Sequence, residues 1–82
     1  MTRFSAAVNV MLKSGIADVQ GKTIERALPA LGYDQVDHVQ VGKRFVVSIE
    51  AENEEEARNL VGQMCDRLLA NPVIESYEVE VT

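Results

Sequence analysis

The stretch that most constrains the fold is residues 67–77, which read RLLANPVIESY. Leu68 and Leu69 close an apolar helical face. Asn71-Pro72 then ends the helix, because the residue before a proline is pushed out of the helical region and proline has no N–H to donate. After the proline, valine and tyrosine recur at odd positions, which is the alternation of a strand. The sequence therefore predicts a helix joined to a last strand by a two-residue stop.

Residues 3–12 also alternate as a strand does. One face carries Phe4, Ala6, Val8, Val10 and Leu12. The other face holds small or apolar residues as well, so partial cover is expected on both sides.

A helix is expected over residues 19–31. Asp18 is placed to cap its start, and Gly32 stands where a left-handed C-terminal cap is needed. Two residues oppose this helix. Gly21 costs about 1 kcal/mol relative to alanine in a helix interior. Pro29 removes a helical hydrogen bond, so a kink or an early end is expected just before it.

Residues 36–51 allow two structures. Their apolar residues stand at odd positions on both sides of Gly42. A hairpin with the three-residue loop Gly42-Lys43-Arg44 preserves this parity. It pairs Val41 with Phe45 and Val39 with Val47. One long strand bent at Gly42 preserves it equally well, with halves that could serve different sheets or different subunits. A hairpin that opens into a continuous strand is a route to domain exchange.

A second helix begins near Asn53. This residue can cap it, Glu56 can complete a capping box, and three consecutive glutamates complement the helix dipole. Apolar residues follow at helical spacing to Leu68. The predicted fold is α+β, with two helices on one face of an antiparallel sheet in a ferredoxin-like β-α-β(β)-α-β order.

Eighty-two residues form one small domain, and a chain of this size buries only about 60–65% of its unfolded surface. Small domains usually need a disulfide, a metal or a partner. Cys65 is the only cysteine and His38 the only histidine, so neither an internal disulfide nor a zinc cluster can form. Self-association or a larger partner is expected to complete the core.

A formal charge of −5 and scattered basic residues argue against a nucleic-acid module. Residues 1–5 lack the apolar run of a signal peptide, and no segment approaches 18 apolar residues. A cytoplasmic protein is expected, without membrane or nucleic-acid partners.

Groups suited to catalysis are scarce. His38 is interpreted as a solvated strand residue, and Cys65 as an inert core thiol on the apolar side of a helix. The run Glu54-Glu55-Glu56 is explained by a helix start without a metal. No glycine spacing matches a phosphate-binding loop. The sequence therefore predicts no catalytic, cofactor or metal residues.

Five residues remain as candidates for contact with another subunit. They are Gly42, Lys43, Arg44, Asn71 and Pro72. The alternative interpretation is a turn with solvated charges and a plain helix stop.

Two strings carry four of these five residues: Val39-Gln40-Val41-Gly42-Lys43 and Leu68-Leu69-Ala70-Asn71-Pro72-Val73-Ile74-Glu75-Ser76-Tyr77. With Met64-Cys65, and with Leu12-Lys13, Gly15, Asp18, Gln20-Gly21 and Leu31-Gly32-Tyr33 earlier in the chain, they resemble the PurS family. The resemblance spans residues 1–82. One departure is Val19, where the family commonly has the proline that sets the first helical position.

The resemblance implies a single PurS-like domain, residues 1–82. Its function would be that of a non-catalytic subunit of phosphoribosylformylglycinamidine synthase in de novo purine biosynthesis. Such a subunit joins a glutaminase to a large ATP-dependent synthetase and supports ammonia transfer between them. ATP, Mg and glutamine are then used by the partners, and this chain is expected to bind no cofactor and to form a dimer or tetramer.

Two other functions compete. One is a small dimeric regulatory domain that binds an amino acid or a nucleotide. The other is a small enzyme using His38 or Glu75, which is disfavoured because no second group is placed to work with either.

Overall fold

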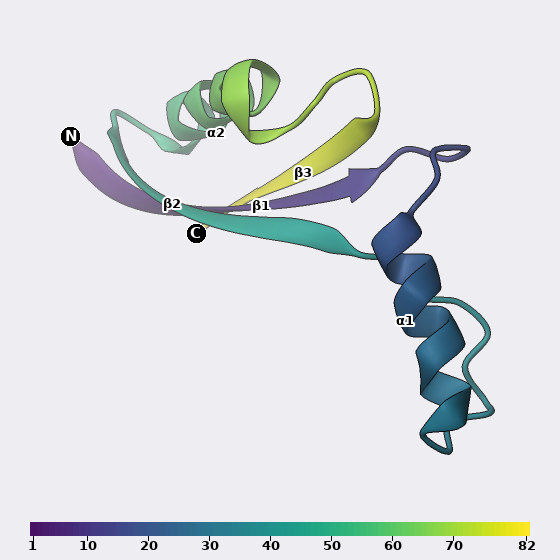
Figure 1. The fold of residues 1–82 in the computed structure, drawn as a ribbon. Coiled ribbons are helices and arrows are strands. Elements are labelled where there is room, and N and C mark those ends of the chain that lie inside the picture. Colours follow the sequence, from purple (N-terminus) through teal and green to yellow (C-terminus); the bar gives the residue numbers. More distant parts are fainter.

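The computed structural model describes all 82 residues, with the elements in the order β-α-β-α-β (Figure 1). The bounds are β1 Thr2–Leu12, α1 Val19–Ala30, β2 Gly42–Ala51, α2 Glu54–Met64 and β3 Glu75–Val81, with a π-helical turn, η1, at Cys65–Leu69. The strands lie in the order β2-β1-β3, and β1 pairs antiparallel with both neighbours. The predicted α+β class and element order are confirmed.

The register places the apolar sides of the three strands on one face. Val8 of β1 lies opposite Phe45 of β2 and Val79 of β3. This face is covered by α2, and Val61 and Cys65 are buried against it. The core is therefore a thin layer between one helix and the sheet.

The predicted helix caps are present. An Asp18 carboxylate oxygen accepts from the Gly21 N–H at 2.9 Å, and the Asn53 side chain accepts from the Glu56 N–H at 2.8 Å. Gly32 follows α1 with a φ of +99°, as a left-handed cap requires. The early end before Pro29 does not occur, because α1 continues to Ala30.

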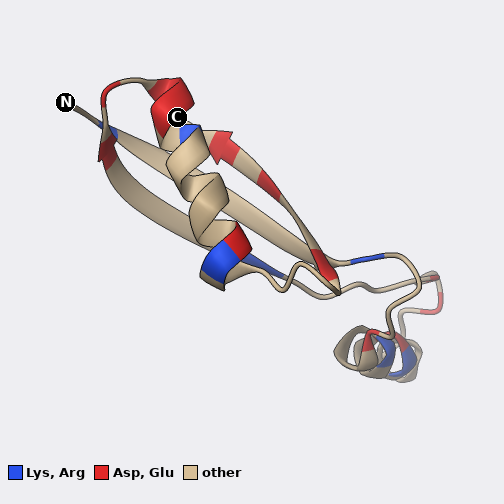
Figure 2. Cartoon of the chain, turned by 90° about the horizontal axis from the view of Figure 1, so that it is seen from above, with Lys and Arg blue, Asp and Glu red and all other residues tan.

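One feature within the predicted fold differs. Only α2 packs on the sheet, whereas α1 stands away from it (Figures 1 and 2). The principal extents are 52 × 26 × 14 Å and the radius of gyration is 16.4 Å, against about 12 Å for a compact chain of this length. Only 9 of 82 residues are buried. The single chain therefore leaves much of its apolar surface uncovered.

Residues 36–51 do not form a hairpin. Residues 36–41 run beside α1 and continue into β2 without turning back (Figure 1). Only the half from Gly42 onward is paired, and its partner is β1. Of the two alternatives, the chain adopts the continuous one.

The turn η1 changes the end of the second helix. The Ala70 N–H donates to the carbonyl of Cys65, five residues back, at 3.0 Å. This wider turn displaces the residues after Cys65 from regular helical spacing. Leu68, predicted to close the apolar face, is 82% exposed as a result. Neither helix is long and apolar enough to cross a membrane.

Candidate subunit interface

Two of the five candidate residues, Lys43 and Asn71, contact Glu75, the first residue of β3. Its side chain is 12% exposed, and its Oε2 lies 3.3 Å from Nζ of Lys43. Its Oε1 accepts from the Asn71 N–H at 2.7 Å. Glu75 thus connects the start of β2 to the helix stop.

Asn71 uses its polar groups inside the turn. Its side-chain oxygen accepts from the Val73 N–H at 3.0 Å, and its carbonyl accepts from the Glu75 N–H at 2.8 Å. The neighbouring Pro72 carbonyl accepts from Nζ of Lys13 at 2.7 Å. Asn71 and Pro72 therefore shape the turn, and the side-chain NH₂ of the exposed Asn71 makes no hydrogen bond within the chain.

The electrostatics follow from these contacts. The Asn71 N–H, with Lys43 beside it, lowers the pKa of Glu75 below its usual value. A hydrogen bond to Asp66 and burial raise the pKa of Tyr77, whose hydroxyl lies 3.0 Å from Asp66 Oδ1. Glu75 is therefore held ionised and Tyr77 neutral.

Of the other two candidates, Gly42 lines a small hollow together with Lys43 and Glu75, and Arg44 lies elsewhere. Arg44 points to the opposite face of the sheet, where its guanidinium donates to Asn9 Oδ1 at 2.9 Å. The sequence predicted a loop or a bend at Gly42, but its φ is not positive, so its backbone does not require a glycine. A Cβ added at Gly42 would instead lie 2.7 Å from the Val10 carbonyl oxygen. The constraint on Gly42 is thus the close approach of β1.

A second cluster, missed at the sequence level, ties residues 36–41 to α1. Asp18 Oδ2 accepts from the Val41 N–H at 2.9 Å, and Glu25 Oε1 accepts from the Val39 N–H at 3.1 Å. The Val41 N–H is the largest cause of the lowered pKa of Asp18, and the Val39 N–H is the largest cause of the lowered pKa of Glu25. The sequence did contain one sign of this contact, namely Gly21, a glycine inside a helix, where glycine is unfavourable.

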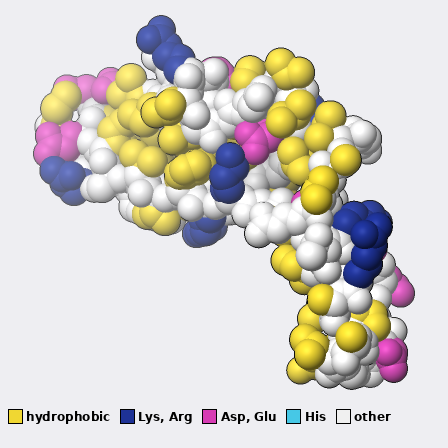
Figure 3. Space-filling view, viewed as in Figure 1, with side chains coloured by type: hydrophobic (Ala, Val, Ile, Leu, Met, Phe, Trp, Pro, Cys, Tyr) yellow, Lys and Arg dark blue, Asp and Glu magenta, His cyan; other side chains and the backbone are white.

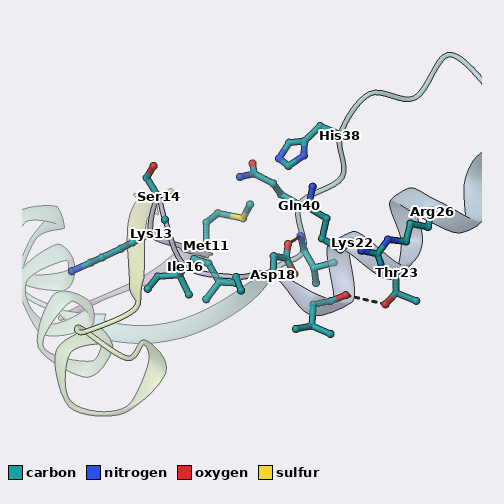
Figure 4. A pocket seen from close by; sticks show the side chains of 15 residues that line it. Met11, Lys13, Ser14, Ile16, Asp18, Lys22, Thr23, Arg26, His38 and Gln40 are labelled. Carbon is teal, nitrogen blue, oxygen red and sulfur yellow. Dashed lines mark hydrogen bonds between the residues drawn. The ribbon is translucent and has the colours of Figure 1, made fainter.

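A hollow of about 540 Å³ opens beside this cluster, between the end of β1 and α1. Figure 4 shows Lys13, from the end of β1, extending toward β3 and away from α1, which carries the other two basic side chains, Lys22 and Arg26. Lys13 therefore does not converge with these two.

Cys65 lies in the environment expected for it, whereas His38 matches its prediction only in part. His38 is exposed, but residues 36–41 are not a strand, and Nδ1 of His38 lies 3.0 Å from Glu25 Oε1, a partner that the sequence did not indicate. Cys65 is buried, and burial raises the pKa of its thiol.

Comparison with known proteins identifies the family. Residues 5–82 match the family model PurS, described as phosphoribosylformylglycinamidine (FGAM) synthase. The chain is 45% identical over 78 residues to the phosphoribosylformylglycinamidine synthase subunit PurS of Methanocaldococcus jannaschii, covering 95% of this chain and 94% of that protein.

Solved structures agree. A chain in the structure of PurLQS from Thermotoga maritima matches with a TM-score of 0.92 and 39% identity, over 100% of both chains. Bacillus subtilis PurS matches with a TM-score of 0.86 and 38% identity, over 96% of this chain and 98% of that one. Sequence and fold thus agree over nearly the whole length, and this chain belongs to the PurS family.

Proposed function

We infer that this chain is the PurS subunit of a phosphoribosylformylglycinamidine synthase in purine biosynthesis. The observation that carries this is the full-length match to a chain of the Thermotoga maritima PurLQS structure, together with the family match over residues 5–82. We propose that the subunit joins the glutaminase and the ATP-dependent synthetase and supports ammonia transfer between them. A cytoplasmic location, and the use of ATP, Mg and glutamine by the partner subunits alone, are parts of this proposal.

Reconstitution tests the coupling role. The glutaminase and synthetase subunits are assayed with and without this chain, first with glutamine and then with ammonium as the nitrogen source. Glutamine-dependent activity is expected to require the chain, whereas ammonium-dependent activity is expected to depend on it less. Equal glutamine-dependent activity with and without the chain would contradict the proposal.

We further propose that the chain works as a homo-oligomer built by exchange of α1 and residues 36–41. Two apolar surfaces of the single chain lack a cover. One lies on α1 and its C-cap, where Ile24 of the helix is 38% exposed and the cap residue Leu31 is 71% exposed. The other lies beside α2, above β2 (Figure 3). Its members are the exposed Met64 and Leu68 and the half-buried Phe45, Val47 and Leu60.

The directions in which the side chains of α2 project show where the second surface lies. Arg58, Gly62 and Asp66 face β3, since they contact Val79 or Tyr77 there. At about 100° per residue, Leu60 and Met64 project to the opposite side, over β2. This is the place a second helix takes in the predicted two-helix layer.

The two edges of the sheet also favour association of a second copy on the β2 side. On the β3 edge, Arg58 donates to the Val79 carbonyl at 3.0 Å, and glutamates line the strand (Figure 2). Such groups discourage strand addition. The β2 edge pairs with nothing in the single chain. The parity of the sequence then sets residues 36–41 of a second copy against β2, with Val41 opposite Phe45 and Val39 opposite Val47.

Light scattering and sedimentation of the isolated chain test the exchange. A dimer or a multiple of it is expected at micromolar concentration. A chain that stays monomeric at all accessible concentrations would contradict it, and would leave the coupling role to be judged by reconstitution alone.

A further inference from the structure

We propose that α1 and residues 36–41 form a pre-assembled arm with a single usable strand edge. Asp18, Glu25 and Gly21 occupy its inner edge, and its outer edge, at His38 and Gln40, pairs with the free β2 edge of a second copy. This inference rests on the exchange proposed above and names the residues that direct it.

The inner edge is filled by carboxylates. The Val41 N–H donates to Asp18 Oδ2 at 2.9 Å, and the Val39 N–H donates to Glu25 Oε1 at 3.1 Å. Asp18 is the N-cap of α1, and Glu25 lies seven residues later, about two turns along the helix. Each thus takes the place of a strand carbonyl opposite an alternate amide of the segment.

Gly21 lets the segment approach the helix closely. It is the one buried residue of α1. A Cβ there would lie 2.7 Å from the Val39 carbonyl oxygen and would overlap the Asp18 carboxylate. Both the N–H and the C=O of Val39 therefore face α1. The glycine that costs the helix about 1 kcal/mol is explained by this contact.

The outer edge is open. The N–H groups of His38 and Gln40 donate to no group within the chain. Neighbouring residues of an extended segment direct their backbone groups to opposite edges. These amides therefore face away from α1 and are available to another strand.

A strand with one usable edge limits the assembly. A segment open on both edges could accept strands on both sides and build open chains. With the inner edge occupied, each arm pairs once, and two arms close a dimer. Holding the segment extended before association also lowers the entropy lost on pairing.

Amide hydrogen exchange as a function of concentration tests the two edges separately. The Val39 and Val41 amides are expected to be protected in both the monomer and the oligomer. The His38 and Gln40 amides are expected to gain protection only in the oligomer. A dimer in which Val39 and Val41 exchange as fast as unbonded amides would overturn the inference while leaving the exchange itself standing. A chain that never dimerises would overturn the exchange, and the outer edge with it.

Matched variants test the carboxylates. Asp18→Asn keeps a helix cap, because asparagine still accepts from the Gly21 N–H, but it presents an NH₂ to the Val41 N–H. Glu25→Ala removes the acceptor for Val39. Asp37→Asn changes the same charge within the segment at a residue that makes no side-chain hydrogen bond.

The dimer dissociation constant is expected to rise by about tenfold in Asp18→Asn and in Glu25→Ala, as loss of a hydrogen bond to a charged group predicts. It is expected to stay within about twofold of wild type in Asp37→Asn, as for a surface substitution. Faster exchange of Val41 in the first variant and of Val39 in the second should accompany the rise. Dissociation constants equal to that of Asp37→Asn would overturn the inference.

Discussion

The Nζ atom of Lys43 lies 3.3 Å from Oε2 of Glu75, although β1 separates their two strands. Lys43 stands beside Gly42, where the arm leaves the sheet, and Glu75 holds the Asn71 N–H of the helix stop. The ion pair therefore links the base of the arm to the turn after η1. The start of β2 and the turn after η1 are therefore held in a fixed position relative to each other.

Glu75→Gln should lower the stability of the chain. Glutamine can still accept from the Asn71 N–H, but it loses the charge that faces Lys43. The urea midpoint is expected to fall relative to wild type. Glu78→Gln is the control, because Glu78 is exposed on the other face of the same strand, and its midpoint should not change. Equal midpoints for both variants would show that the ion pair contributes nothing.

Stability should decline as the pH falls below about 4.5, the ordinary pKa of glutamate. The pKa of Glu75 is lowered in the folded chain, first by the Asn71 N–H, and those of Asp18 and Glu25 are lowered by the N–H groups of Val41 and Val39. A group with a lowered folded pKa stabilises fully above its unfolded pKa, and loses that contribution as pH falls through its folded pKa.

Urea midpoints measured from pH 7 down to pH 3 check this dependence. Glu75→Gln is expected to show a shallower decline than wild type, because one of the titrating groups is gone. A wild-type midpoint that does not change across this range would contradict the pKa directions.

Sequence patterns predicted the strands, the caps and the order of elements, because alternation and capping are local properties. They did not predict that α1 leaves its own sheet. Periodicity shows that Ile24 and Leu28 form an apolar side but not whose sheet covers it. The role of Glu75 was missed for a related reason. Its odd position among apolar residues placed it on the covered face, but its partners, Lys43 and Asn71, are set by strand pairing.

Gly21→Ala and Gly62→Ala form a matched pair of helix substitutions. Helix propensity alone favours alanine by about 1 kcal/mol at both sites. At Gly62 a Cβ would meet only the Tyr77 hydroxyl, 3.9 Å away, so Gly62→Ala should be neutral or stabilising. At Gly21 it would collide with the Val39 carbonyl, so Gly21→Ala should destabilise by about 1–3 kcal/mol. Urea unfolding measures both, and a stabilised Gly21→Ala would show that residues 36–41 do not lie against α1.

Leu68→Ser should weaken self-association without unfolding the chain. Leu68 is 82% exposed in the single chain, so the substitution removes little contact there. In the proposed exchange it meets α1 of a second copy, where burying a leucine contributes about 1.5–3 kcal/mol. The dimer dissociation constant is therefore expected to rise at least about tenfold. Val73→Ser is the control, since Val73 is 77% exposed in the turn before β3, at the sheet edge opposite β2 and the exchanged segment. Sedimentation equilibrium of the three proteins decides: equal dissociation constants for Leu68→Ser and Val73→Ser would place the second copy somewhere other than beside α2.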